Sequence, residues 1–175
     1  MRGLALGVAI LALTPVVALA HGPSRQKVTE TVEINAPPEK VWKVIGNFQD
    51  MSWHPAVAKT EGTGGNEPKA TRTLTLTSGG KLEEQLLKYE PDKMTYKYEM
   101  HHPDVKVLPV NNYSSMISVK GEGDKSTVQW RGAFYRGFMN NDPPPELSDE
   151  AAKKAVTDVY RSGLDALKKN IEAGG

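Results

Sequence analysis

The sequence predicts an α+β protein in which an antiparallel sheet packs against one long C-terminal helix. Between residues 56 and 136, short alternating segments follow one another, separated by turn residues. Residues 148–173 instead carry an apolar stripe with a 3.6-residue period. Consecutive strands with the helices set apart from them are typical of an antiparallel sheet.

Residues 148–173 are predicted to form one amphipathic helix. Ser148 is a suitable N-cap residue and Gly174 a suitable terminator. At 1.5 Å per residue the helix is roughly 39 Å long, enough to cross a whole sheet. Ala155 and Gly163 lie on its apolar stripe and leave room beneath it. We therefore expect a curved sheet that grips this helix, with a cavity between them.

The first 20 residues have the pattern of a signal peptide. Arg2 precedes an apolar run over residues 4–13, and Ala18-Leu19-Ala20 forms a small-x-small cleavage site. A membrane anchor is disfavoured because the run is short and Pro15 interrupts it. We expect an exported domain of residues 21–175 with no membrane attachment after cleavage.

Composition excludes several classes of protein. The chain has 22 basic and 21 acidic residues, and Arg2 is the one charged residue of the leader, so the remainder is formally neutral. This balance argues against binding to nucleic acid or to a lipid surface. The chain contains no cysteine, so disulfides do not contribute to its stability.

The first strand is predicted over residues 27–34, where Val28, Val32 and Ile34 alternate with polar residues. Residues 35–38 end it, a short helix follows over residues 39–45, and the apolar residues of 48–53 indicate a second one. Six further strands are expected over residues 56–62, 69–77, 81–89, 94–100, 113–120 and 127–136. Their alternation gives the sheet one covered and one solvated face.

Several strings in this order resemble the polyketide cyclase/dehydrase branch of the START/Bet v 1-like (SRPBCC, helix-grip) superfamily. They are Val41-Trp42 with residues 45–48, Trp53-His54-Pro55, residues 72–76, residues 108–113 and residues 160–168. The resemblance implies a seven-stranded antiparallel sheet wrapped around the C-terminal helix, with two short helices after the first strand. It is weaker on activity, because the superfamily contains binders, carriers and a few enzymes.

Within that superfamily the chain is most similar to the MxaD-type accessory proteins of methanol oxidation. The similarity rests on His21-Gly22-Pro23, residues 64–67 and Phe134-Tyr135-Arg136. It implies a periplasmic, non-enzymatic protein without a cofactor, which assists methanol dehydrogenase and its cytochrome c acceptor. Two alternatives stay open: a binder or carrier of a small hydrophobic ligand, and a cavity enzyme of the cyclase/dehydratase type.

Candidate ligand-binding residues share the face that is expected to line the cavity. They are Lys59, Leu74, Leu82, Glu84, Leu86, Tyr96, Tyr113, Ser115, Val159 and Gly163. Lys59 enters by resemblance to the abscisic-acid receptors, and we expect it to pair with Glu84 or to be solvated. Glu84 shares its face with two leucines, so it is a polar anchor for a ligand, half of an ion pair, or a residue at the cavity mouth. Trp130, Phe134 and Tyr160 are large enough to fill the cavity instead.

The resemblance places the cavity entrance at two loops, formed by Ser78, Gly79 and Gly80 and by Leu108, Pro109 and Val110. No catalytic motif is present; the enzyme alternative would use Glu84 as a base and Tyr113 as an acid or an oxyanion donor. No metal site has the expected spacing, and His54 is expected to be a hydrogen-bonded core residue. His21, as a mature N-terminus, would offer an amine and an imidazole to copper, an alternative left open.

Overall fold

The computed structural model describes residues 22–174, so the predicted signal peptide and His21 lie outside the described residues. The elements run β1 (Gln26–Ile34), α1 (Pro38–Ile45), β2 (Val57–Thr63), β3 (Thr71–Leu76), β4 (Lys81–Glu90), β5 (Thr95–His101), β6 (Val110–Glu122), β7 (Lys125–Arg136) and α2 (Asp149–Ala173). Two 3-10 turns, Pro91–Lys93 and Pro145–Leu147, complete them. In this part of the chain no helix combines the length and the hydrophobicity needed to cross a bilayer.

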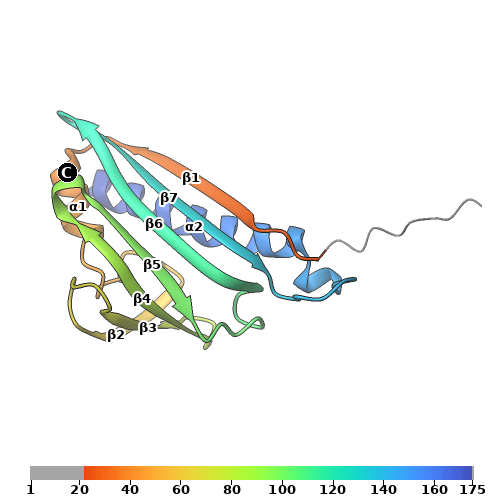
Figure 1. The fold of residues 1–175 in the computed structure, drawn as a ribbon. Coiled ribbons are helices and arrows are strands. Elements are labelled where there is room, and N and C mark those ends of the chain that lie inside the picture. Colours follow the sequence, from red (N-terminus) through yellow and green to blue (C-terminus); the bar gives the residue numbers. More distant parts are fainter. Residues whose placement is uncertain (1–21, 175) are drawn as a thin grey trace, which may run out of the picture.

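The seven strands form one antiparallel sheet with the order β1-β7-β6-β5-β4-β3-β2. The sheet bends, and α2 runs along its inner face behind β1 and β7 (Figure 1). The predicted fold class is thereby confirmed: a helix-grip arrangement of a curved sheet and a C-terminal helix. Each strand lies within a few residues of its predicted range.

One part of the fold prediction is wrong. Two short helices were expected after the first strand, and the structure has one, α1. The following segment forms isolated turns, in which Asp50 N donates to Asn47 O at 3.0 Å and His54 N donates to Met51 O at 2.9 Å. Pro55 also disfavours a helical conformation at His54, so these turns do not extend into a helix.

The core lies between the sheet and α2. In β5, Tyr96, Tyr98 and Met100 point inward, whereas Lys97 and Glu99 alternate with them on the outer face. Most of the predicted stripe of α2 is buried, and Ala155 and Val159 are half-buried; the buried members are Ala152, Val156, Tyr160, Gly163, Leu164, Leu167 and Ile171. The helix begins as expected, because Ser148 Oγ accepts a hydrogen bond from Ala151 N at 3.2 Å.

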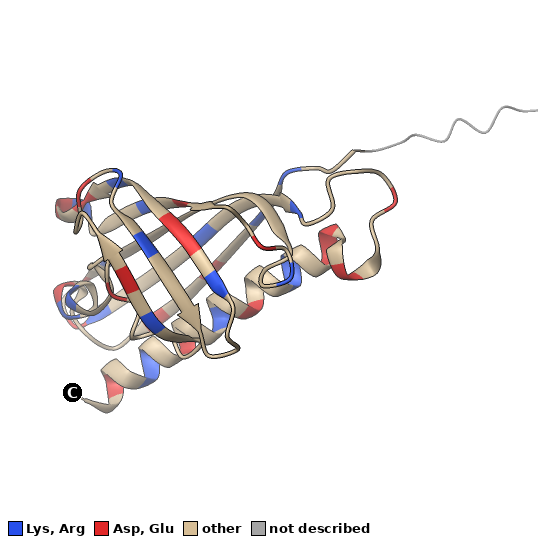
Figure 2. Cartoon of the chain, turned by 90° about the horizontal axis from the view of Figure 1, so that it is seen from below, with Lys and Arg blue, Asp and Glu red and all other residues tan. Residues whose placement is uncertain are grey.

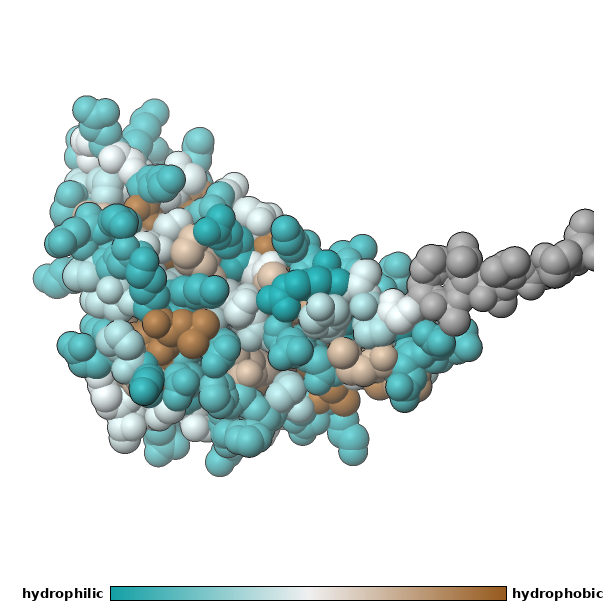
Figure 3. Space-filling model, in the orientation of Figure 1, coloured by the Kyte–Doolittle hydropathy of each residue, from teal (hydrophilic) through white to brown (hydrophobic). Residues whose placement is uncertain are grey.

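The surface is mixed in charge and mostly hydrophilic. Basic and acidic residues are interspersed over the strands and along α2 (Figure 2). The outer face of the sheet, which faces the viewer in Figure 3, shows isolated hydrophobic spots among hydrophilic atoms. Val44, Leu87 and Met139 are the large hydrophobic residues that are exposed in the described part of the chain.

Candidate functional site

The space between α2 and the sheet, where a ligand cavity was expected, is occupied by aromatic side chains. The Trp130 indole of β7 stacks on the Tyr160 ring of α2, with centroids 4.3 Å apart and an interplanar angle of 13°. Phe134 stacks on Tyr113 at 6.2 Å, and all four residues are buried. The residues that the sequence named as possible fillers therefore occupy the interior.

Two glycines, Gly132 and Gly163, allow this close packing because they have no side chain. A Cβ at Gly163 would lie 2.5 Å from Cδ2 of His54 and 3.1 Å from Cζ3 of Trp130. A Cβ at Gly132 would clash with the Tyr160 hydroxyl. The room that Gly163 was predicted to leave beneath the helix is thus taken up by His54 and Trp130.

A chain of hydroxyl groups crosses the interior. The Tyr113 and Tyr160 hydroxyls lie 2.7 Å apart, and Tyr160 lies 2.9 Å from Ser115 Oγ. Ser115 donates to the Arg131 carbonyl at 3.0 Å, and a carbonyl can only accept. This fixes the direction of the chain: Tyr113 donates to Tyr160, Tyr160 donates to Ser115, and Ser115 donates to the backbone.

The same network also provides hydrogen-bond acceptors for the indole nitrogen of Trp130. Trp130 Nε1 donates to Ser115 Oγ at 2.9 Å and to the Tyr98 hydroxyl at 3.1 Å. Burial raises the pKa of Tyr98, Tyr113 and Tyr160 well above the ordinary value. These phenols stay protonated near neutral pH and act as partners for one another.

A buried ion pair joins β3 to β4 beside this cluster. Arg72 Nε donates to Glu84 Oε2 at 2.7 Å, and Arg72 Nη1 donates to the Phe48 carbonyl at 2.7 Å. The guanidinium carbon lies 4.2 Å above the Phe48 ring and 5.0 Å above the Tyr98 ring. Arg72 and Glu84 face each other in the strand register. Strand pairing, hydrogen bonding and cation–π contacts thus hold the guanidinium in place.

Of the two alternatives expected for Lys59, pairing with Glu84 is wrong, whereas an exposed, solvated side chain is what the structure has. Lys59 is exposed on β2 and its Nζ lies 2.7 Å from Glu61 Oε1. Arg72 takes the place that Lys59 was expected to fill. Burial raises the pKa of Glu84, and the Arg72 guanidinium opposes that shift. Burial lowers the pKa of Arg72, but the Glu84 carboxylate together with Tyr96 and Tyr98 more than offsets it, so that pKa is raised.

His54 is a satisfied core residue, as predicted. Its Nε2 lies 3.0 Å from the Val159 carbonyl of α2, and Ala56 N donates to its Nδ1 at 3.1 Å. A carbonyl only accepts, so Nε2 carries the proton and the imidazole is neutral. Burial lowers the pKa of His54. The residue therefore ties the turn before β2 to the middle of α2.

A small apolar cavity of about 70 Å³ lies near the predicted entrance, and of the six predicted entrance residues Leu108 lines it. Leu82, Leu108 and Val159, three of the candidate residues, line it together with His54. Gly80 of the first entrance loop packs closely on Val107, the residue before the second loop, since a Cβ at Gly80 would lie 2.8 Å from the Val107 side chain. Val107 also lines the cavity. Val110, expected in the second loop, instead begins β6 and is fully buried.

The other ligand-binding candidates lie on the predicted inner side, except Lys59, which neighbours Thr75 and not Leu74 in the strand register. Leu74, Leu82, Leu86, Tyr96, Tyr113, Ser115 and Gly163 are buried on the inner side, Val159 is half-buried, and Lys59, Ser78 and Gly79 are exposed. Their role in ligand binding stays a prediction. In residues 22–174 no cluster of three histidine or carboxylate side chains could hold a metal ion.

The comparison with protein families identifies the fold independently. The family described as polyketide cyclase/dehydrase and lipid transport matches residues 25–172. The chain belongs to this family. Its resemblance to the polyketide cyclase/dehydrase branch is thus confirmed, whereas the resemblance to MxaD-type proteins stays a prediction.

Solved structures extend the polyketide cyclase/dehydrase assignment. The protein XoxI from Bacillus cereus is 32% identical with a TM-score of 0.70, over 83% of this chain and 94% of its own. An uncharacterized protein from Bacillus thuringiensis is 31% identical with a TM-score of 0.70, over 83% and 98%. Norcoclaurine synthase from Thalictrum flavum is 15% identical with a TM-score of 0.64, over 95% and 98%, a likeness of fold alone. Comparison with curated proteins gave no match.

The buried ion pair between Arg72 and Glu84 predicts that Glu84→Gln strongly destabilises the protein. The substitution leaves the Arg72 charge buried without its counter-charge, so we expect the free energy of unfolding in urea to fall by about 3 kcal/mol. Glu83→Gln, on the exposed side of the same strand, is the matched control and should change it by less than about 0.5 kcal/mol. Equal stability of Glu84→Gln and wild type would show that the carboxylate does not neutralise Arg72.

Neutral His54 predicts a pH dependence of stability. In the unfolded chain the pKa of His54 is 6.5, and in the folded chain it is lower. At a pH between the folded and the unfolded pKa, the unfolded chain therefore binds more protons than the folded chain. The free energy of unfolding should therefore decrease as the pH falls through 6.5, and His54→Gln should lack that component. His102→Gln is the control, because His102 is exposed. A full wild-type slope in His54→Gln, measured by urea unfolding at a series of pH values, would contradict the assignment.

Proposed function

We propose that this chain is a non-enzymatic periplasmic accessory protein of methanol oxidation, which assists methanol dehydrogenase and its cytochrome c acceptor through its surface. The observation that carries the proposal is the filled interior. Trp130, Tyr160 and Phe134 occupy the space in which relatives of this fold could hold a ligand. A protein whose interior is packed with its own side chains acts through contacts made outside it.

The proposal is also supported by the engagement of the groups that an enzyme would need. Glu84, the base of the cyclase/dehydratase alternative, binds Arg72, and Tyr113, the acid, donates to Tyr160. Neither group lines the small cavity near the predicted entrance, whose lining is apolar apart from His54. The fold itself is neutral on this point, because one fold hosts binders and enzymes alike.

Export is part of the same proposal. Residues 1–20 have the charged start, apolar run and small-residue cleavage site of a signal peptide. We therefore assign the working protein to residues 21–175 in the periplasm. The similarity of its local strings to MxaD-type proteins supports this compartment and names the two redox proteins as partners.

Reconstitution tests the proposal. Adding residues 21–175 to purified methanol dehydrogenase and its cytochrome c acceptor should raise the rate of cytochrome reduction with methanol at least about twofold, and the effect should saturate as the partners become occupied. The reason is that an accessory protein which holds the two redox proteins together increases the frequency of productive encounters.

The control omits the dehydrogenase, and cytochrome reduction should then be absent. An unchanged rate at every ratio of the three proteins would contradict the accessory role. Native mass spectrometry of the same preparation addresses the carrier alternative, since a hydrophobic molecule that co-purifies at full occupancy would favour a ligand carrier instead.

A further inference from the structure

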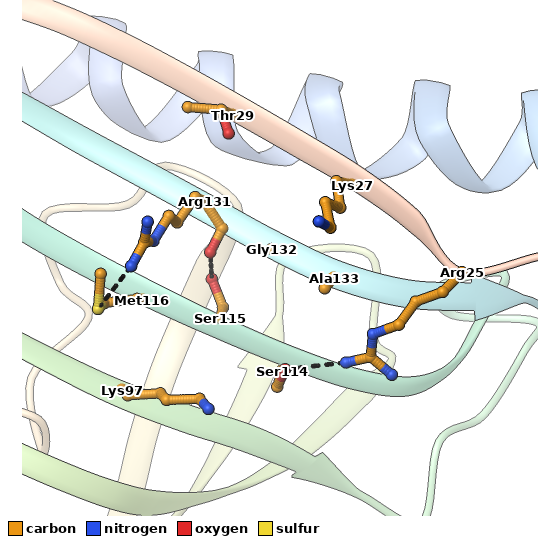
Figure 4. Close-up of a pocket in the computed structure, with 10 residues that line it drawn as sticks. All are labelled: Arg25, Lys27, Thr29, Lys97, Ser114, Ser115, Met116, Arg131, Gly132 and Ala133. Atoms are coloured by element: carbon orange, nitrogen blue, oxygen red, sulfur yellow. Dashed lines mark hydrogen bonds between the residues drawn. The ribbon is translucent and has the colours of Figure 1, made fainter.

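A basic groove lies on the outer face of the sheet, on the side opposite α2. It has a volume of about 410 Å³ and crosses β1, β7, β6 and β5. Its four cationic residues are Arg25, Lys27, Lys97 and Arg131, and all four are exposed. Figure 4 shows their side chains on the front of the sheet, with the helix behind it.

The strand register explains why the face is hollow here. Across the strands, Lys27 of β1 pairs with Ala133 of β7, and Ala133 pairs with Ser114 of β6. Two short side chains therefore lie next to the long side chain of Lys27. The next row places Arg131 and Lys97 on either side of Met116. The short residues form a low floor, and the long cationic side chains form its walls.

The four cations are free for a partner. Among the ion pairs of the described residues none involves Arg25, Lys27, Lys97 or Arg131. Arg25 instead donates to Ser114 Oγ at 3.4 Å and lies 5.6 Å above the Tyr135 ring, and Arg131 donates to Met116 Sδ at 3.6 Å.

Carboxylates contribute little to this part of the outer face. Glu99 stands opposite Ser114 in the register, outside the groove lining, and its Oε1 lies 3.2 Å from His101 Nε2. No acidic residue lines the groove. The positive charge is therefore local, on a chain whose total charge is close to zero.

We propose that this groove docks an acidic segment of a partner protein, through several carboxylates at once. The inference rests on the accessory role proposed above, since it names the surface through which that role is exercised. Lys27 on β1 and Lys97 on β5 are three strand spacings apart, about 14 Å. An extended peptide covers that distance with about four residues, so carboxylates on alternate residues reach successive cations.

The spacing also separates this occupant from others. One small anion cannot contact cations spread over about 14 Å, whereas a peptide chain can. A lipid surface would be expected to engage exposed apolar side chains as well as the cations. Met116, the large apolar residue of the groove, is only half-exposed and contacts Arg131.

Fluorescence anisotropy with a labelled peptide of alternating Glu and Gly tests the proposal. The peptide should bind residues 21–175 at about 50 mM NaCl and dissociate at about 300 mM, because salt screens exposed charges. Lys97→Gln combined with Arg131→Gln should weaken binding about tenfold. The matched control, Lys120→Gln with Lys153→Gln, removes the same charge elsewhere on the surface and should weaken it less than about twofold.

The proposal would be overturned by no binding of the Glu-Gly peptide at low salt, by equal binding of a Gln-Gly peptide, or by equal losses in the two double variants. Binding to phosphatidylserine vesicles without peptide binding would likewise overturn it, in favour of a membrane surface. The cytochrome assay separates this inference from the accessory role. If the Lys97→Gln, Arg131→Gln variant still stimulates cytochrome reduction, the groove is not the docking surface, but the accessory role stands. If the wild-type protein binds the peptide without stimulating cytochrome reduction, the groove binds acidic segments, but the accessory role is rejected.

Discussion

The contact between Trp130 and Tyr160 is the constraint on which the rest of the structure depends. It joins the middle of β7, the strand next to the sheet edge formed by β1, to the middle of α2, with ring centroids 4.3 Å apart. Large aromatic side chains contribute much of the apolar surface that folding buries, and a stacked pair adds a preferred geometry. Gly132 and Gly163 permit this contact, because a side chain at either position would collide with the cluster or with His54.

Filling the interior has chemical consequences. The polar atoms of the aromatic residues must find partners inside the protein, since an unpaired buried hydroxyl is costly. The donor chain from Tyr113 through Tyr160 and Ser115 to a backbone carbonyl provides them. Beside it, Arg72 meets the same demand in part: its Nε donates to Glu84 and its Nη1 to the Phe48 carbonyl, whereas its Nη2 has no hydrogen-bond partner among the described residues. Glu84 and Tyr113, the two groups named for the enzyme alternative, are thus hydrogen-bonded to Arg72 and Tyr160 within the filled interior.

The periodicities of the sequence predicted the strands, the long helix and the inner face, because these depend on local alternation. The partner of Glu84 depended on strand register, which local patterns do not define. A signal for Arg72 was present, since it lies two residues before Leu74 on the same face of β3. Resemblance to receptors favoured Lys59 instead. The filled interior depended on side-chain volumes across four elements, and the basic groove unites residues 25, 27, 97 and 131, which are far apart in the sequence.

A crystal structure of residues 21–175 under xenon pressure tests the central claim most directly, because xenon enters dry apolar cavities. A filled interior predicts that the atoms of the gas occupy, at most, the small cavity beside Leu82, Leu108 and Val159. It also predicts that the Tyr113 and Tyr160 hydroxyls remain in hydrogen-bond contact. Xenon or ligand density between Trp130 and Tyr160, with those hydroxyls apart, would contradict the account.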